Sequence, residues 1–113
     1  MGRQLLYRFE DYVLDTGRRE LRGDGALIRV EPQVFDVLTF LVGNRHQVVS
    51  KEDLIATVWG GRIVSESTLG SRINAARRAI GDSGSEQRLI RTTIGKGVGL
   101  LALFRRNRLG RSP

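Results

Sequence analysis

The spacing of the hydrophobic residues changes at Pro32 and divides the chain into a strand part and a helical part. Before it, Leu5, Tyr7 and Phe9 recur at every second position, which is the period of a β-strand. Glycine-containing turns break residues 4–30 into short segments, so a small antiparallel sheet of three or four strands is expected. After the proline, which favours the first turn of a helix, apolar residues recur every three or four positions. The two periods together predict an α+β fold.

Three helices are predicted after the sheet. They cover residues 31–43, 51–59 and 66–81, and each runs up to a glycine that ends the helical pattern. Ser50 and Ser65 occupy the positions where the second and third helices need a side chain to cap their first turn. The helical part is therefore a series of three short helices.

A β-hairpin is predicted to close the fold. Residues 88–104 contain a β-branched strand, a tight turn at Gly95-Lys96-Gly97 and a returning strand. The pair Val48-Val49 is long enough only for a bridge to the sheet. Residues 1–104 are expected to form one domain, and the basic residues 105–113 a disordered tail.

Composition excludes several classes of protein. The chain has 113 residues and no cysteine, so one modest core must hold without disulfides or thiolate metal sites. Its single histidine, His46, lies in a polar stretch, and no acid–base pair or phosphate-loop spacing is present, so we expect no enzyme, no cofactor and no metal site. No signal peptide opens the chain and no apolar run is long enough to span a bilayer, so a cytoplasmic location without a membrane partner is expected.

Positive charge is concentrated in the second half of the chain. Residues 1–61 contain eight Lys or Arg and nine Asp or Glu, whereas residues 62–113 contain eleven and three, so the net charges are −1 and +8. Of the 19 basic residues 17 are arginine, a ratio that codon usage in a GC-rich genome would largely explain. Codon usage does not explain the asymmetry, which indicates a surface for a polyanion.

The third predicted helix has two contrasting faces. Its apolar residues Leu69, Ile73, Ala76 and Ile80 fall on one narrow arc that must pack against the core. The opposite side carries Ser67, Ser71, Asn74 and Arg78, with Arg77 at one edge. Hydroxyl, amide and guanidinium groups are the types that reach base edges and phosphates in a major groove. A solvated amphipathic helix would show the same pattern, so this helix alone leaves both interpretations open.

The chain resembles the DNA-binding effector domain of OmpR/PhoB-type response regulators of two-component systems, which ToxR/CadC-type regulators also carry. The resemblance covers about residues 7–97 and rests on many short elements in order. They are Phe9, Leu14-Asp15, Arg19-Glu20-Leu21, Val30-Glu31-Pro32-Gln33-Val34-Phe35-Asp36-Val37-Leu38, Val48-Val49-Ser50-Lys51-Glu52-Asp53-Leu54, Val58-Trp59-Gly60, Ser67-Thr68-Leu69, Ile73-Asn74-Ala75-Ala76-Arg77-Arg78-Ala79-Ile80-Gly81-Asp82, Ile90-Arg91-Thr92 and Gly95-Lys96-Gly97.

The resemblance implies a winged helix-turn-helix with an N-terminal four-stranded sheet, three helices and a C-terminal hairpin wing. It implies sequence-specific binding of double-stranded DNA by a recognition helix over 66–81, commonly on direct repeats with two protomers head to tail. The implied contacts on that helix are Ser67, Thr68, Ser71, Arg72, Asn74, Ala75, Arg77 and Arg78. The loop 60–65 resembles a segment through which relatives touch RNA polymerase, although a plain connector is as good an interpretation.

Two positions depart from the family pattern. Many relatives hold arginine where this chain has Ala75, so a guanine contact is expected to be missing there. The hairpin lacks the usual basic residue near Ile94 and Gly95, which leaves Arg91 and Lys96 for the minor groove.

The apolar run 98–104 supports an alternative function. It is longer than one face of a hairpin can bury, so a protein-interaction module that docks through this strand is the second hypothesis. RNA binding is a third hypothesis, but the sequence lacks the exposed aromatic residues that stack unpaired bases.

Overall fold

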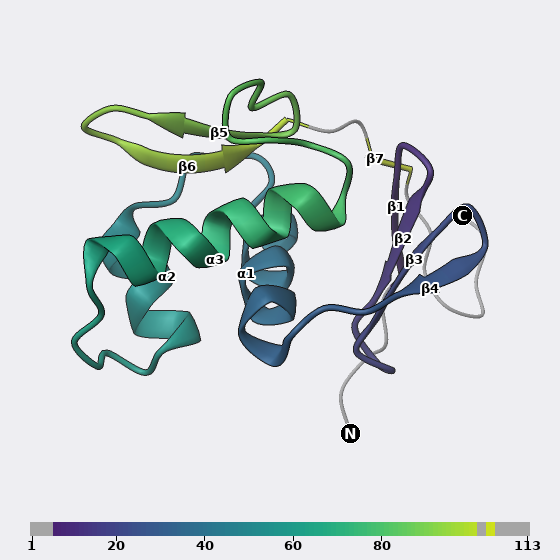
Figure 1. Ribbon diagram of the computed structural model, residues 1–113, viewed down its shortest axis with the longest axis horizontal. Coiled ribbons are helices and arrows are strands. Elements are labelled where there is room, and N and C mark those ends of the chain that lie inside the picture. Colours follow the sequence, from purple (N-terminus) through teal and green to yellow (C-terminus); the bar gives the residue numbers. More distant parts are fainter. Residues whose placement is uncertain (1–5, 102–103, 106–113) are drawn as a thin grey trace. The chain divides into compact units, whose positions relative to one another are not determined.

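The structure is a computed structural model that describes residues 6–101 and the backbone of residues 104 and 105. The described residues form two compact units, one of residues 6–30 with 104–105 and one of residues 31–101. The first unit is a β-sheet, and the second contains three helices and a β-hairpin (Figure 1). The predicted α+β fold with its N-terminal sheet, three helices and C-terminal hairpin is confirmed.

The first unit is an antiparallel sheet in the strand order β4-β3-β2-β1-β7. Its first four strands are β1 (Leu6–Phe9), β2 (Tyr12–Asp15), β3 (Glu20–Gly23) and β4 (Ala26–Ile28). One face carries the buried side chains of Phe9, Leu14 and Leu21, and the other carries the exposed Arg8 and Arg22. This alternation is the two-residue period that the sequence shows.

The second unit is built around α1 (Pro32–Gly43), which contacts α2 (Lys51–Val58), α3 (Glu66–Ala79) and the hairpin strand β6 (Gly97–Leu100). Pro32 starts α1 as expected. One stripe of the helix is buried among these partners: Val34, Phe35, Val37, Leu38, Leu41 and Val42. Figure 1 shows α3 lying across α1 with the hairpin alongside. Removing this apolar stripe from water supplies the main stabilisation of the unit.

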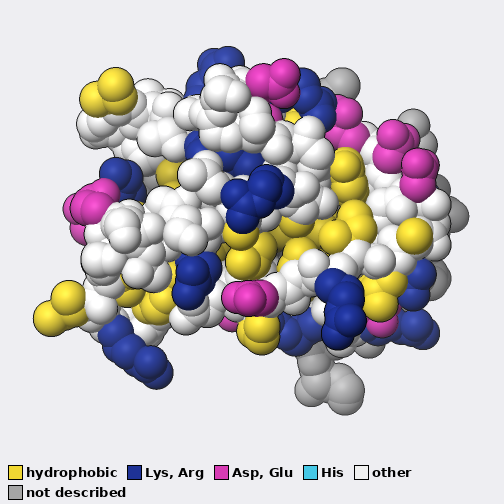
Figure 2. All heavy atoms as spheres, viewed as in Figure 1, with side chains coloured by type: hydrophobic (Ala, Val, Ile, Leu, Met, Phe, Trp, Pro, Cys, Tyr) yellow, Lys and Arg dark blue, Asp and Glu magenta, His cyan; other side chains and the backbone are white. Residues whose placement is uncertain are grey.

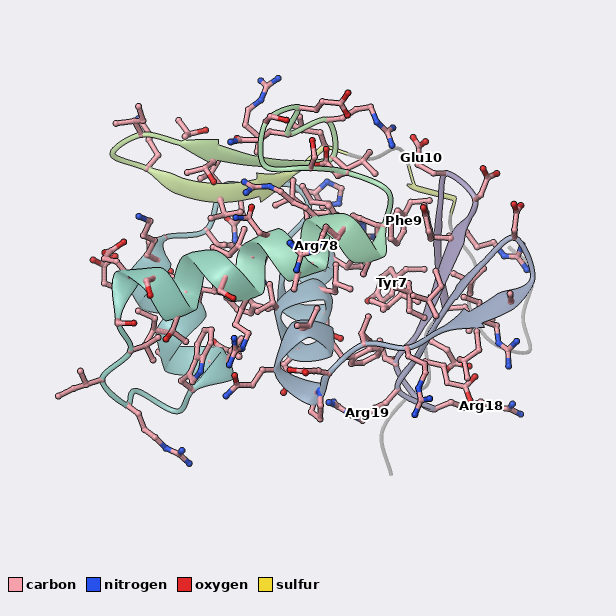
Figure 3. The ribbon with its side chains drawn as sticks, viewed as in Figure 1. Tyr7, Phe9, Glu10, Arg18, Arg19 and Arg78 are labelled. Atoms are coloured by element: carbon pink, nitrogen blue, oxygen red, sulfur yellow. The ribbon has the colours of Figure 1, made fainter. Side chains whose placement is uncertain are left out.

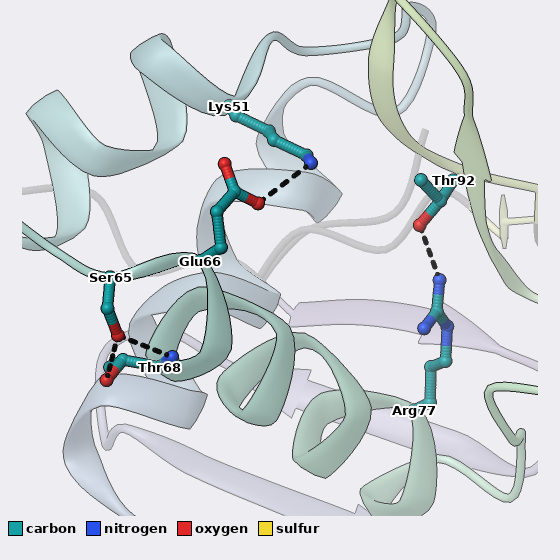
Figure 4. Close-up of polar contacts among 6 residues, drawn as sticks. All are labelled: Lys51, Ser65, Glu66, Thr68, Arg77 and Thr92. Atoms are coloured by element: carbon teal, nitrogen blue, oxygen red, sulfur yellow. Dashed lines mark hydrogen bonds and ion pairs between the residues drawn. The ribbon is translucent and has the colours of Figure 1, made fainter.

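Serine side chains cap the first turns of α2 and α3. Ser50 Oγ accepts the N–H of Asp53 at 3.0 Å. Ser65 Oγ accepts the N–H of Thr68, also at 3.0 Å (Figure 4). Lys51 Nζ lies 3.3 Å from Glu66 Oε1, which joins the first turns of α2 and α3. Both predicted caps are therefore confirmed, and α2 and α3 start where the sequence placed them.

The hairpin pairs β5 (Ile90–Thr93) with β6 in antiparallel register. Val49 and Val98 exchange two backbone hydrogen bonds of 2.8 Å, so the short Val48-Val49 segment bridges to β6 of the hairpin. The prediction of a bridge is confirmed, but its partner is the hairpin and not the N-terminal sheet. Gly97 makes this approach possible, because it has φ of 135° and a Cβ there would collide with the carbonyl oxygen of Val49.

The prediction of one returning strand over 98–104 is wrong. Strand β6 ends at Leu100, which lies opposite Ile90, the first residue of β5. The next strand, β7 (Phe104–Arg105), pairs with β1. Beyond the Ile90–Leu100 pair one further backbone bond forms, from the N–H of Leu101 to the carbonyl of Leu89 at 2.7 Å, and the next strand is accepted by the edge of β1. Residues 102–103 and the predicted tail residues 106–113 lie outside the described residues.

A polar joint fastens the end of α3 to β5. Asp82, which follows the helix, accepts the backbone N–H groups of Arg88 at 2.7 Å and of Leu89 and Ile90 at 2.9 Å. From the last turn of α3, Arg77 donates from Nε to the carbonyl of Ile90 at 2.9 Å and from a terminal nitrogen to Thr92 Oγ1 at 2.8 Å (Figure 4). Both charged side chains are buried, with 4 % of Arg77 and 6 % of Asp82 exposed. The joint therefore fixes the hairpin to α3.

The joint also sets the pKa of Asp82. Burial raises the pKa of this carboxyl, but hydrogen bonds from the backbone of Ile90, Leu89, Arg88 and Ser83 lower it, and the result is a pKa of about 2. A carboxyl in an unfolded chain has a pKa of about 3.9. The ionised form is therefore favoured by folding.

We predict that acid weakens the fold through Asp82. Because its folded pKa lies below the unfolded value, its contribution is complete above about pH 4 and is lost as the pH falls to about 2, a change of about 2 kcal/mol. Urea unfolding between pH 5 and pH 2 measures this. Asp82→Asn should lower stability at neutral pH, and its difference from the original chain should shrink with acid. The control Asp24→Asn, on the exposed β3–β4 turn, should show no such convergence. An acid-independent difference for Asp82→Asn contradicts the prediction.

A second prediction concerns Gly97. Gly97→Ala should lower the free energy of unfolding by about 3 kcal/mol or more, because it combines a positive φ with the collision at Val49. Gly95→Ala is the matched control: Gly95 also has a positive φ, of 77°, but nothing lies within 4 Å of its Cβ position. It should cost only about 1–2 kcal/mol. Chemical denaturation measures both, and equal losses would contradict the role assigned to the close approach.

Candidate nucleic-acid interface

Helix α3 has one buried and one exposed face. The inward arc is confirmed, since Leu69, Ile73, Ala76 and Ile80 are at most 4 % exposed. The outer face carries a row of exposed side chains spaced by four, three and four residues: Ser67, Ser71, Asn74 and Arg78. We call these four residues the outer row. Figure 3 shows Arg78 on the side of α3 turned toward the viewer, and Figure 2 shows Lys and Arg side chains on this face.

The position of Arg77 corrects the interpretation drawn from the sequence. It was expected to contact DNA from the edge of the helix, but it is buried and belongs to the joint with β5. A third donor group of its guanidinium bonds Asn74 Oδ1 at 2.7 Å. Burial lowers the pKa of Arg77 and the charge of Asp82 raises it, but an arginine stays protonated in proteins. Arg77 therefore supports the outer row from behind.

Arg72 is held by a residue that the sequence did not single out. It is half-buried, and its Nε donates to Gln33 Oε1 on the first turn of α1 at 3.0 Å. This bond uses one of five donor hydrogens, so the terminal nitrogens of Arg72 keep donor capacity. Gln33 and Arg72 are 39 residues apart, and no local pattern links them.

The remaining expected contacts on α3 lie at the flanks of the outer row. Thr68 is half-buried, and its hydroxyl is 3.0 Å from Ser65 Oγ, so it takes part in the helix cap. Ala75 is half-buried and adds no polar group. Gly70 is half-buried, and a Cβ there would meet nothing within 4 Å, so the helix surface is flat at this point. Contact of any of these residues with DNA stays a prediction.

The hairpin presents two cations and one apolar side chain. Arg91 on β5 and Lys96 on the turn are both exposed. Between them, Ile94 is 96 % exposed at the tip. The tip therefore combines one positive charge with a hydrophobic side chain of the kind that most proteins bury.

The loop between α2 and α3 is also exposed. Gly60 and Gly61 have positive φ of 64° and 82°, and Arg62 and Ile63 follow them. Ile63 is fully exposed. The loop thus exposes a charged and an apolar side chain to solvent. This exposure is compatible both with a plain connector and with a protein-binding segment.

Other kinds of site find no support in the part of the chain that the structure describes. Those residues contain no group of three or more His, Asp or Glu side chains that could hold a metal ion. Among them, too, no helix combines the length and the hydrophobicity that crossing a bilayer requires.

Comparison with known proteins identifies the family. Residues 25–100 match the family described as "Transcriptional regulatory protein, C terminal". The transcriptional regulator HilA of Salmonella typhimurium is 33 % identical over 89 residues, which are 79 % of this chain and 16 % of HilA. The chain thus spans less than a fifth of that relative.

Solved structures show the same fold. The DNA-binding domain of Escherichia coli CadC superposes with a TM-score of 0.76 at 21 % identity, covering 94 % of this chain and 100 % of that domain. The Klebsiella pneumoniae RstA DNA-binding domain was solved in complex with the RstA box. It superposes with a TM-score of 0.73 at 19 % identity, and the match covers 84 % of this chain and 95 % of that domain. The family match spans more than half of the chain. The chain therefore belongs to the OmpR/PhoB-type family of winged helix DNA-binding domains of transcriptional regulators.

Proposed function

We propose that this chain binds double-stranded DNA at a preferred sequence and so regulates transcription, with α3 in the major groove and the β5–β6 hairpin at the adjacent minor groove. The observation that carries the proposal is the outer row of α3. Its hydroxyl, amide and guanidinium groups are exposed along one line of a helix whose opposite face is buried. A major groove is wide enough to admit such a helix.

The proposed contacts differ in kind. The outer row faces base edges, and Arg72 and Arg91 bind phosphates, since a guanidinium pairs well with phosphate oxygens. Thr68 and Ala75 flank the row and contribute mainly shape. Lys96, on the turn of the hairpin, contacts the minor groove. Arg77 acts indirectly, by holding the hairpin and Asn74 in place.

The comparisons support DNA as the partner. The chain belongs to a family of transcriptional regulatory domains, and a protein with the same fold, RstA, was solved bound to its DNA box. Binding by two protomers head to tail on direct repeats, and contact of RNA polymerase with the loop 60–65, are further parts of the proposal. The proposed role is recognition and involves no catalytic step.

The alternative of a protein-docking strand over 98–104 loses support. Val98 and Leu100 are 0 % and 6 % exposed, and the backbone of β6 is paired with β5 and bridged to Val49. Among residues 98–101, the part of this run whose side chains the structure describes, only Leu101 is exposed. A single exposed leucine is ordinary for a protein surface.

Arg78→Ala tests the outer row. We expect this change to weaken binding to the preferred duplex by roughly 1–3 kcal/mol, because a contact with a base or phosphate is lost. The duplex is first selected from a random library, and the dissociation constant is then measured by fluorescence anisotropy at several salt concentrations. Arg18→Ala removes the same charge from the exposed β2–β3 turn (Figure 3) and should change the affinity little.

Two results would contradict the proposal. One is selection that yields no preferred sequence, with equal affinity for chosen and scrambled duplexes. The other is an equal loss for Arg78→Ala and Arg18→Ala, which would mean that only net charge matters.

A further inference from the structure

The side-chain amide of Asn74 has a fixed orientation, and this orientation limits what it can recognise. Arg77 donates to Asn74 at 2.7 Å. A guanidinium has only donors, so the atom that receives this bond must be the amide oxygen Oδ1. The buried Arg77 is itself held by Ile90 and Thr92, so it cannot turn away without breaking the joint.

Gly84 closes the space around the same oxygen. A Cβ on Gly84 would lie 2.8 Å from Oδ1 of Asn74 but 3.7 Å from its Nδ2. The oxygen is therefore the part of the amide that lies nearest to Gly84 and to Arg77. The residue is nevertheless exposed and stands in the outer row between Ser71 and Arg78.

An asparagine with a free amide typically selects adenine. It does so with two bonds at once, because its oxygen accepts from N6 of the base while its nitrogen donates to N7. In Asn74 one of the two lone pairs of the oxygen is used by Arg77, and Gly84 lies on the oxygen side of the amide, so the nitrogen with its two hydrogens is the group best placed to meet a ligand.

We infer that Asn74 acts toward the duplex only as a hydrogen-bond donor and selects guanine at one base pair. Guanine alone offers two adjacent acceptors, O6 and N7, in the major groove, whereas adenine places a donor beside its N7. The inference rests on the proposed function, since it requires α3 in the major groove. It goes beyond that proposal by naming the base and the atom that chooses it.

The test compares the base preferences of three variants with those of the unmodified chain, using selection from a random duplex library. In Asn74→Ala one position of the preferred sequence should lose its preference for guanine, by about tenfold or more. Asn74→Asp keeps an oxygen for Arg77 but presents a second oxygen outward, so the same position should lose guanine and gain cytosine, whose N4 is a donor. Gln47→Glu makes the same amide-to-carboxylate change on the exposed α1–α2 loop and should leave every preference unchanged.

Base analogues add a measurement on the unmodified protein. At the position that Asn74 governs, replacing guanine by 7-deazaguanine removes the N7 acceptor and should weaken binding severalfold. The same replacement at other guanines of the site serves as the control. Thermal unfolding of each variant shows whether the joint and the fold persist.

The outcomes separate the two ideas. If the unmodified chain selects no sequence, the proposed function fails. If it selects a sequence, the inference fails when Asn74→Ala changes no position, when the affected base pair is A·T, or when Asn74→Asp retains guanine on the same strand. Loss of guanine in both variants, with or without the gain of cytosine, supports it.

Discussion

The hydrogen bonds that Arg77 and Asp82 make to β5 and the residues just before it are the interaction on which the second unit depends. One α-helical end supplies both charged groups, and together they hold the backbone of Arg88, Leu89 and Ile90 and the hydroxyl of Thr92. A hairpin of two strands has little stability by itself. Here it is attached to α3 by charge-assisted hydrogen bonds, to α1 by apolar packing and to Val49 by a backbone bridge. Three separate sets of contacts therefore hold the hairpin against the helices.

Burying two opposite charges is costly unless their hydrogen bonds are complete. In this structure three nitrogens of Arg77 have acceptors, and Asp82 accepts from several backbone donors. The two side chains are linked less by direct contact than through the strand they share. Loss of either would leave buried polar groups without partners, and such groups cost more than a well-made bond contributes.

Local patterns predicted the elements of the fold. The helical period, the caps Ser50 and Ser65 and the inward arc of α3 depend on neighbours within one or two turns, so the sequence alone reveals them. Family resemblance predicted how the elements are ordered. The split of the run 98–104 into two strands was missed, because it depends on the free edge of β1, almost a hundred residues away.

The candidate site was predicted less completely than the fold. The exposure of the outer row follows from the helical wheel. Arg77 was misjudged, since a wheel places it at the boundary and only the acceptors on Ile90 and Thr92 draw it inward. Two glutamines were missed because each bonds a partner in another part of the chain: Gln33 accepts from Arg72, and Gln87 Oε1 accepts the backbone N–H of Thr92 at 2.9 Å. An arginine at the edge of the helical wheel, followed by Gly81-Asp82 at the helix end, is the one local signal that could have indicated the joint.

The same contacts have a consequence for how the protein behaves when concentrated. The outer edge of a hairpin ordinarily presents free N–H and C=O groups, and these invite strands from other molecules to add on and build fibrils. On β5 the N–H groups of Ile90 and Thr92 are taken by Asp82 and Gln87, and the carbonyl of Ile90 by Arg77. Side chains from the preceding part of the chain therefore occupy hydrogen-bonding groups on the free edge of β5. This lowers the tendency of the hairpin to add strands from other molecules.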